Sequence, residues 1–168
     1  MHDKLRYNYL VQKEVIRSSY FEGELESEDM SRLSELTIPS GQKIGVTFEF
    51  VQSEYDVPKI QGSLKCKLDM QCQRCLQAME IAIDQDFQLL IDAKDDLVSE
   101  SKLDSVMSDE GYVDIREIIE DELILTIPLV AMHEDTTCHE FWQHTEPEIE
   151  PAQKENPFAV LAQLKTKH

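Results

Sequence analysis

Residues 59–91 read KIQGSLKCKLDMQCQRCLQAMEIAIDQDFQLLI and hold the two longest alternating patterns in the chain. Apolar and polar residues alternate on both sides of the central Cys72-Gln73-Arg74-Cys75, and Gln85 is the one interruption. Such alternation is typical of strands with one buried face and one wet face. The stretch therefore predicts two antiparallel strands, with the two cysteines at or near the turn that joins them.

Shorter patterns on either side predict the rest of the domain. Alternation predicts further strands, and apolar residues at helical spacing predict two helices, one that Ser27 caps and one that stops before Pro128. The expected strands cover residues 20–25 and 44–50, and the expected helices cover residues 28–36 and 115–127. We therefore predict an α+β fold, an antiparallel β-meander with a few helices packed on it.

Composition divides the chain into three parts. Residues 1–144 are expected to form a single α+β domain, in which the acidic, aperiodic stretch 92–111 reads as a loop or insertion. Residues 145–155 contain prolines among acidic residues and predict a linker. Residues 156–168 predict a short tethered helical motif with a basic end, in which Asn156 caps and Pro157 takes the first helical position. Its candidate partner-binding residues are Asn156, Pro157, Phe158, Leu161, Leu164, Lys165 and Lys167.

The net charge of −18 is concentrated in the middle of the chain. Residues 84–150 carry three Lys/Arg and twenty Asp/Glu, a net charge of −17. Such a region repels a phosphate backbone but suits a basic protein, although it could also serve solubility alone. On the predicted helix, Glu117, Glu120, Asp121 and Glu122 form what reads as a solvated acidic surface or a docking face.

No apolar run is long enough for a membrane span, and the first residues lack the apolar core of a secretory signal. Four cysteines without such a signal favour reduced thiols or a metal over disulfides. We therefore expect a cytoplasmic protein that has no membrane partner.

Cys72-x-x-Cys75 has the spacing of a two-thiolate metal knuckle. Together with His133 and Cys138 it would give a Cys3His set, which suits one structural zinc, and His139 could replace His133. Two alternatives remain open, a redox pair or thiols without a ligand. The antiparallel neighbours do not supply the strand–helix context of a thioredoxin-like site. Cys66 shares the parity of the core residues and is expected to be buried.

No catalytic signature accompanies these residues. The sequence has no G-x-S-x-G, phosphate-binding G-x-x-x-x-G-K-[ST], H-E-x-x-H or G-x-G-x-x-G motif. We therefore expect no enzyme activity and no small-molecule substrate.

Three segments together resemble the YceD family, the bacterial large ribosomal RNA subunit accumulation proteins. They are Cys72-Gln73-Arg74-Cys75, the run from Glu120 to Val130 that leads into His133 and Cys138, and Asn156-Pro157-Phe158-Ala159-Val160-Leu161-Ala162-Gln163-Leu164-Lys165. The resemblance spans nearly the whole chain, and the terminal block is its most specific part. Some relatives have more cysteines where this chain has His133 to Cys138, which favours a metal site there.

The resemblance implies a non-enzymatic, cytoplasmic role in the synthesis, processing or stability of 23S ribosomal RNA during large-subunit biogenesis. The partner would be a ribosomal RNA precursor or a large-subunit ribosomal protein. For direct RNA contact the candidates lie in the hairpin, the tail and the opening segment: Lys65, Lys67, Arg74, Lys165, Lys167, Lys4, Arg6, Lys13 and Arg17. The alternative is an acidic chaperone or adaptor for a basic ribosomal protein, and a Cys-x-x-Cys redox protein is a more distant one.

Overall fold

The computed structural model describes residues 5–135, 137 and 138. The chain forms two compact units, residues 1–134 and residues 135–168, and the fold below is that of the first unit. Of the second unit, Asp135 accepts hydrogen bonds from the backbone N–H and the hydroxyl of Thr137. His139, the predicted linker 145–155 and the predicted motif 156–168 lie outside the described residues.

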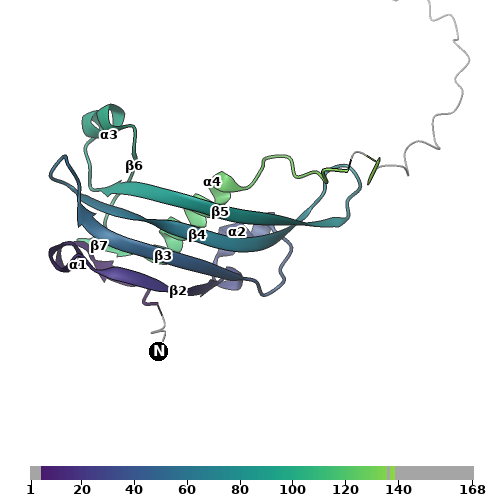
Figure 1. Ribbon diagram of the computed structural model, residues 1–168, viewed down its shortest axis with the longest axis horizontal. Helices are drawn as coiled ribbons and strands as arrows, with labels where there is room; N and C mark the ends of the chain where they lie inside the picture. The colour runs from purple at the N-terminus through teal and green to yellow at the C-terminus, as the bar shows by residue number, and fades with distance from the viewer. Residues whose placement is uncertain (1–4, 136, 139–168) are drawn as a thin grey trace, which may run out of the picture. The chain divides into compact units, whose positions relative to one another are not determined.

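The first unit is built on a twisted five-stranded sheet (Figure 1). Strands β2 (Tyr20–Glu26), β3 (Lys43–Gln52), β4 (Pro58–Gln71) and β5 (Ala78–Ile91) pair antiparallel in chain order. The predicted antiparallel meander is thus confirmed. Strand β6 (Asp104–Val106) adds a parallel partner at the edge beside β5, which the sequence did not predict.

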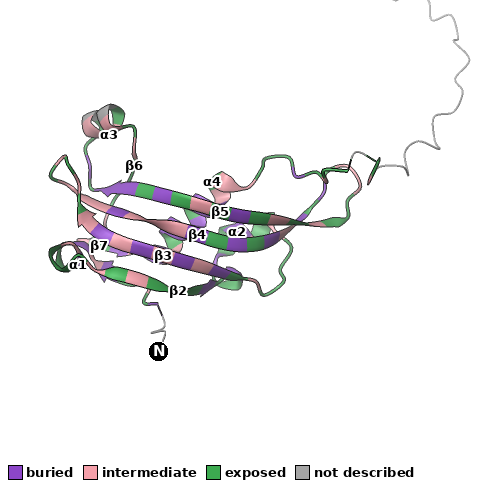
Figure 2. Ribbon diagram, in the orientation of Figure 1, coloured by how far each residue is buried: buried purple, intermediate pink, exposed green. Residues whose placement is uncertain are grey.

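The alternation in β4 and β5 separates the two faces of the sheet, as the banding in Figure 2 shows. In the register Cys66 lies opposite Ile83, and both side chains are buried in the core. The prediction that Cys66 acts as a small buried hydrophobe is confirmed. Gln85, which interrupts the alternation, lies beside helix α4 (Ile115–Thr126). The Thr126 hydroxyl donates a hydrogen bond to the side-chain oxygen of Gln85.

One face of the sheet is covered by helix α4 (Ile115–Thr126) (Figure 1). The apolar stripe of α4 is buried in the core. Asp114 caps the N-terminus of α4 by accepting a hydrogen bond from the backbone N–H of Arg116 at 2.8 Å. The predicted helix is therefore confirmed. Strands β1 (Asn8–Leu10) and β7 (Tyr112–Asp114) pair antiparallel in a second, two-stranded sheet, and α4 follows directly after β7.

Two local predictions about the helix at residues 28–36 were wrong. Ser27 does not cap a helix, because residues Ser27–Asp29 form a 3-10 turn, and α2 (Ser31–Leu36) begins only after Met30. The stretch 92–111, predicted as a loop or insertion, contains α3 (Asp95–Ser101) and β6.

The elements α1 (Val11–Arg17), α3 and β6 are too short to repeat an apolar pattern, so periodicity did not reveal them. Among the described residues, no helix is both long enough and apolar enough to cross a membrane.

Candidate metal centre

The two cysteines lie in the tight turn between β4 and β5. The backbone N–H of Cys72 donates to the carbonyl of Gln77, and that of Leu76 donates to the carbonyl of Cys72, both at 2.9 Å. Leu76 has a φ of 60°, in the left-handed region. The chain thus reverses in a closed turn, which holds both thiols on one side.

The segment that follows α4 is bonded to this turn. The backbone N–H of Gln73 donates to the carbonyl of Ala131 at 2.8 Å, and the Arg74 guanidinium donates to the carbonyl of His133. These bonds bring the imidazole of His133 to the thiols, with 3.4 Å between His133 Nδ1 and Cys75 Sγ. Residues about sixty positions apart in the sequence therefore meet through backbone contacts.

Cys72, Cys75, His133 and Cys138 each offer one ligand atom, and these four atoms all lie within 4.8 Å of one another. Cys72 is fully buried, whereas the other three are half-buried. All four predicted ligands are thus brought together. Three sulfurs and one nitrogen match the donor set of closed, tetrahedral zinc sites, so the residues present fit such an ion.

The environment of Cys72 favours the thiolate. Burial alone would raise its pKa, but hydrogen bonds from the backbone N–H groups of Cys75, His133 and Arg74, and from the Cys75 thiol, lower that pKa to about 5. Cys66 shows the opposite behaviour, because burial without such donors raises its pKa to about 11. The hydrogen-bond donors around Cys72, which Cys66 lacks, therefore favour the thiolate, the form of cysteine that binds a metal.

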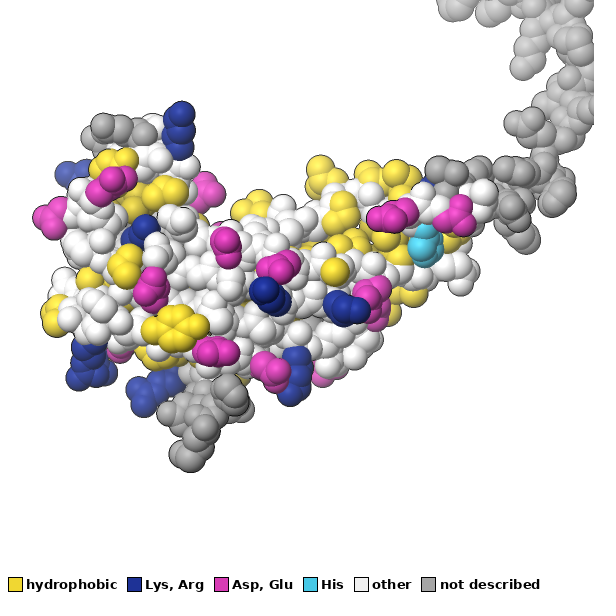
Figure 3. Space-filling view, in the orientation of Figure 1, with side chains coloured by type: hydrophobic (Ala, Val, Ile, Leu, Met, Phe, Trp, Pro, Cys, Tyr) yellow, Lys and Arg dark blue, Asp and Glu magenta, His cyan; other side chains and the backbone are white. Residues whose placement is uncertain are grey.

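The hairpin cations predicted to contact RNA are engaged within the protein. Lys65 Nζ lies 3.2 Å from an Asp84 carboxylate oxygen, and Lys67 Nζ lies 2.7 Å from one of Glu80. Figure 3 shows dark-blue and magenta side chains lying next to each other across the face of the sheet in view. Arg74 instead holds the His133 segment, so its place in the structure is that of an anchor.

The acidic face of α4 is not uniformly solvated, which corrects the expectation from the sequence. Glu120 is buried and accepts hydrogen bonds from the backbone N–H groups of Arg32 and Leu33 and from the Arg32 guanidinium. Glu122 is buried as well. The helical pattern placed both residues outside the apolar stripe, but it could not reveal which other elements cover that side.

Comparisons with known proteins show which family the sequence matches. The model of a family described as "Large ribosomal RNA subunit accumulation protein YceD" matches residues 60–165. A protein of that name from Haemophilus influenzae (strain ATCC 51907 / DSM 11121 / KW20 / Rd) is 30% identical over 162 residues, which cover 92% of each chain. No solved structure gives a significant match.

Proposed function

This chain is a member of the YceD family, and we propose that it acts without catalysis in the accumulation of large-subunit ribosomal RNA. The observation that carries the proposal is the similarity over 92% of both chains to a relative with that name. The protein would act in the cytoplasm, in the synthesis, processing or stability of 23S ribosomal RNA during large-subunit biogenesis. Levels of 23S ribosomal RNA in cells that lack this protein test the proposal.

The mode of action we propose is that of an acidic adaptor for a basic large-subunit ribosomal protein. Each of Lys65 and Lys67 has a carboxylate beside it, which weakens the attraction of this face for a phosphate backbone. Residues 84–150 carry a net charge of −17, which attracts a basic partner and repels RNA. The predicted contacts at Asn156, Pro157, Phe158, Leu161, Leu164, Lys165 and Lys167 remain candidates for either partner.

A pull-down with the tagged full-length chain, before and after RNase treatment, separates the two modes. We expect a basic large-subunit ribosomal protein to remain bound after RNase, and to remain bound to a Lys65→Ala, Lys67→Ala variant. Loss of every partner on RNase treatment would instead identify RNA as the direct ligand. The same assay without residues 156–168 shows whether that segment takes part.

We also propose that Cys72, Cys75, His133 and Cys138 hold one structural zinc ion. Support comes from their ligand atoms, within 4.8 Å of one another, and from the backbone donors that favour the Cys72 thiolate. A closed four-ligand site contributes folding energy and leaves no open position for chemistry. Its role would be to fix the segment after α4 to the β4–β5 turn.

Metal analysis of purified protein tests the zinc site. We expect about one zinc per chain, which is lost in Cys72→Ser and Cys138→Ser but kept in Cys66→Ala, because Cys66 lies in the core. A chelator should lower the melting temperature of the wild type and leave that of Cys72→Ser unchanged. Sub-stoichiometric zinc that does not respond to Cys72→Ser would refute the site. Titration of free thiols in the native protein would then detect a redox pair.

A further inference from the structure

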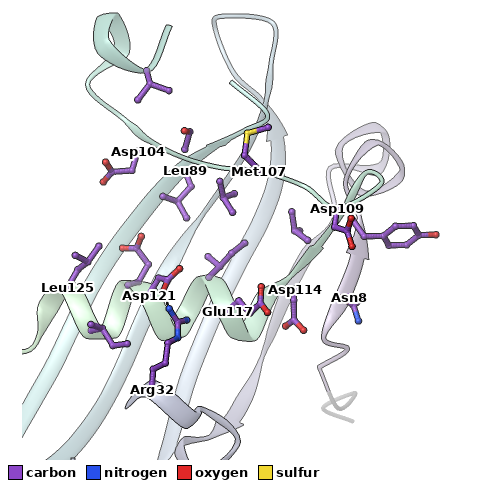
Figure 4. Close-up of a pocket in the computed structure, with 18 residues that line it drawn as sticks. Asn8, Arg32, Leu89, Asp104, Met107, Asp109, Asp114, Glu117, Asp121 and Leu125 are labelled. Atoms are coloured by element: carbon purple, nitrogen blue, oxygen red, sulfur yellow. Dashed lines mark hydrogen bonds and ion pairs between the residues drawn. The ribbon is translucent and has the colours of Figure 1, made fainter. Parts of the chain in front are cut away.

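A groove of about 740 Å³ lies between α4 and the edge strand β6. In Figure 4 acidic side chains from α4, β6 and the β7 region surround it, and Leu89, Met107 and Leu125 supply apolar surface. Met107 and Leu125 are 71% and 75% exposed, which is unusual for large apolar side chains. The groove thus combines uncovered apolar surface with a negative rim.

The rim has few cations of its own. Arg32 is the one basic residue that lines the groove, and its guanidinium is paired with Glu120 at 2.9 Å and with Asp121 at 2.6 Å. Asp114 is paired with Arg116. Among the described residues, the remaining lining carboxylates have no ion-pair partner: Asp104, Asp109, Glu117 and Glu122.

Glu122 differs from the other carboxylates because it is 9% exposed and still lines the groove. Within the described part of the chain, its carboxylate has neither an ion-pair partner nor a hydrogen-bond donor. Burial, together with repulsion from Asp104 and Asp121, raises its pKa. The Glu122 carboxylate oxygens are not among the fully buried atoms, so they can be reached from the groove. Partial desolvation still raises the free energy of the charged carboxylate, and a cation supplied from outside would offset that cost.

We propose that this groove binds a cationic, amphipathic segment of a partner protein, with a lysine or arginine of that segment pairing with Glu122 and Asp104. The apolar side chains of the same segment would cover Met107 and Leu125. The proposal rests on the adaptor mode proposed above and assigns it a site.

Two observations favour a peptide over other cationic ligands. All three residues of β6 line the groove, and no described strand pairs with its outer edge, so backbone groups are available to an extended chain. The thiol–imidazole set is the one group of described residues close enough to share a metal ion, so the groove carboxylates are not placed as such a cluster. Apolar surface beside the carboxylates requires a ligand that is itself partly apolar.

Fluorescence anisotropy with the full-length protein tests the proposal. The probe is a short labelled peptide of alternating lysine and leucine, and its counterpart alternates glutamate and leucine. We expect the lysine peptide to bind and Glu122→Gln to weaken it about tenfold or more, because the buried charge pair is lost. The control, Asp86→Asn, removes the same charge from an exposed position outside the groove and should change affinity less than about twofold.

Equal weakening by Glu122→Gln and Asp86→Asn would overturn the proposal, because it would indicate general charge attraction. Competition by spermidine as strong as that by unlabelled peptide would overturn it as well, since charge alone would then suffice. Glu122→Gln should melt no lower than the wild type, so that lost binding is not lost folding. Either negative result refutes the groove without bearing on ribosomal RNA accumulation, which is measured separately in cells.

Discussion

Glu122 is a carboxyl group whose ionisation opposes folding. Burial and the neighbouring Asp104 on β6 and Asp121 on α4 raise its pKa above the ordinary value of 4.5, and Arg32 on α2 is committed to other acids. The folded chain therefore holds this proton more tightly than the unfolded chain does. The stabilisation that protonated Glu122 gives the folded chain is present below pH 4.5 and is lost as pH rises through the raised pKa.

Thermal melts of the wild type and Glu122→Gln across pH test this directly. The variant should melt close to the wild type well below pH 4.5 and higher than the wild type at neutral pH. Each kcal/mol relieved should raise the melting temperature by about 2–4 °C. Asp86→Asn serves as the control for the loss of one exposed negative charge outside the groove. A difference between wild type and Glu122→Gln that does not vary with pH would contradict the account.

Gly62 on β4 lies where the neighbouring strand β3 approaches its backbone closely. A Cβ at this position would collide with the carbonyl oxygen of Thr47 and lie 2.9 Å from Cα and Cβ of Phe48, so the neighbouring strand would have to move. We expect Gly62→Ala to lower the free energy of unfolding by about 2–3 kcal/mol. Urea denaturation measures it.

Gly45 on the adjacent strand provides the matched substitution. Its Cβ would meet the Lys65 carbonyl at 3.4 Å, close to ordinary contact. Gly45→Ala should therefore be neutral or stabilise by up to about 0.5–1 kcal/mol, because alanine has less freedom in the unfolded chain. Similar losses in both variants would show that the close approach at Gly62 is not the cause.

The sequence predicted the cluster of thiols and imidazole better than it predicted the buried acids. Cys72, Cys75, His133 and Cys138 are recognisable because metal ligands have restricted chemistry and spacing. Glu120 and Glu122 look like other surface acids, and what buries them comes from elements far away in the sequence. The signal for Glu120 was indirect, namely that α2 begins without a side-chain cap of its own and so needs an outside acceptor.

At the scale of elements, the contact between α2 and α4 depends on Glu120. Burial opposes its ionisation, but donation from the backbone N–H of Leu33 and from Arg32 outweighs burial and lowers the pKa of Glu120. The contribution of this group is present above pH 4.5 and is lost as pH falls through the lowered pKa. Glu120 thus acts in the opposite sense to Glu122, two residues away.

Glu120→Ala should destabilise the protein by about 2–3 kcal/mol, because two backbone N–H groups of α2 lose their acceptor. Asp121→Ala is the matched variant, since Asp121 pairs with the same arginine at an exposed position. It should cost less than about 1 kcal/mol. Equal losses in urea denaturation at neutral pH would assign the effect to Arg32 pairing and not to the backbone acceptor.

The long elements were predictable from the sequence, whereas several of the short ones were not. The strands β3, β4 and β5 and the helix α4 repeat their patterns often enough to define a period. The seven-residue helices α1 and α3 and the three-residue strand β6 do not. Tertiary pairing stabilises β6 beside β5, and no local pattern encodes such a contact.

Within the described part of the molecule, two regions differ in the roles that we propose for them. The β4–β5 turn holds the thiols and His133, while the groove between α4 and β6 holds uncompensated negative charge. The Cys-x-x-Cys motif is prominent in the sequence, yet in our account its role is structural. The groove is lined by residues from seven helices and strands, so no local pattern in the sequence revealed it, and it is the better candidate for partner binding.

The ratio of 23S to 16S ribosomal RNA in cells that lack this protein tests the proposed role most directly. We expect a lower ratio than in wild-type cells, restored by the full-length chain and by the Lys65→Ala, Lys67→Ala variant. The 16S ribosomal RNA serves as the internal standard, because the proposed role concerns the large subunit alone. An unchanged ratio in cells without the protein would contradict the account.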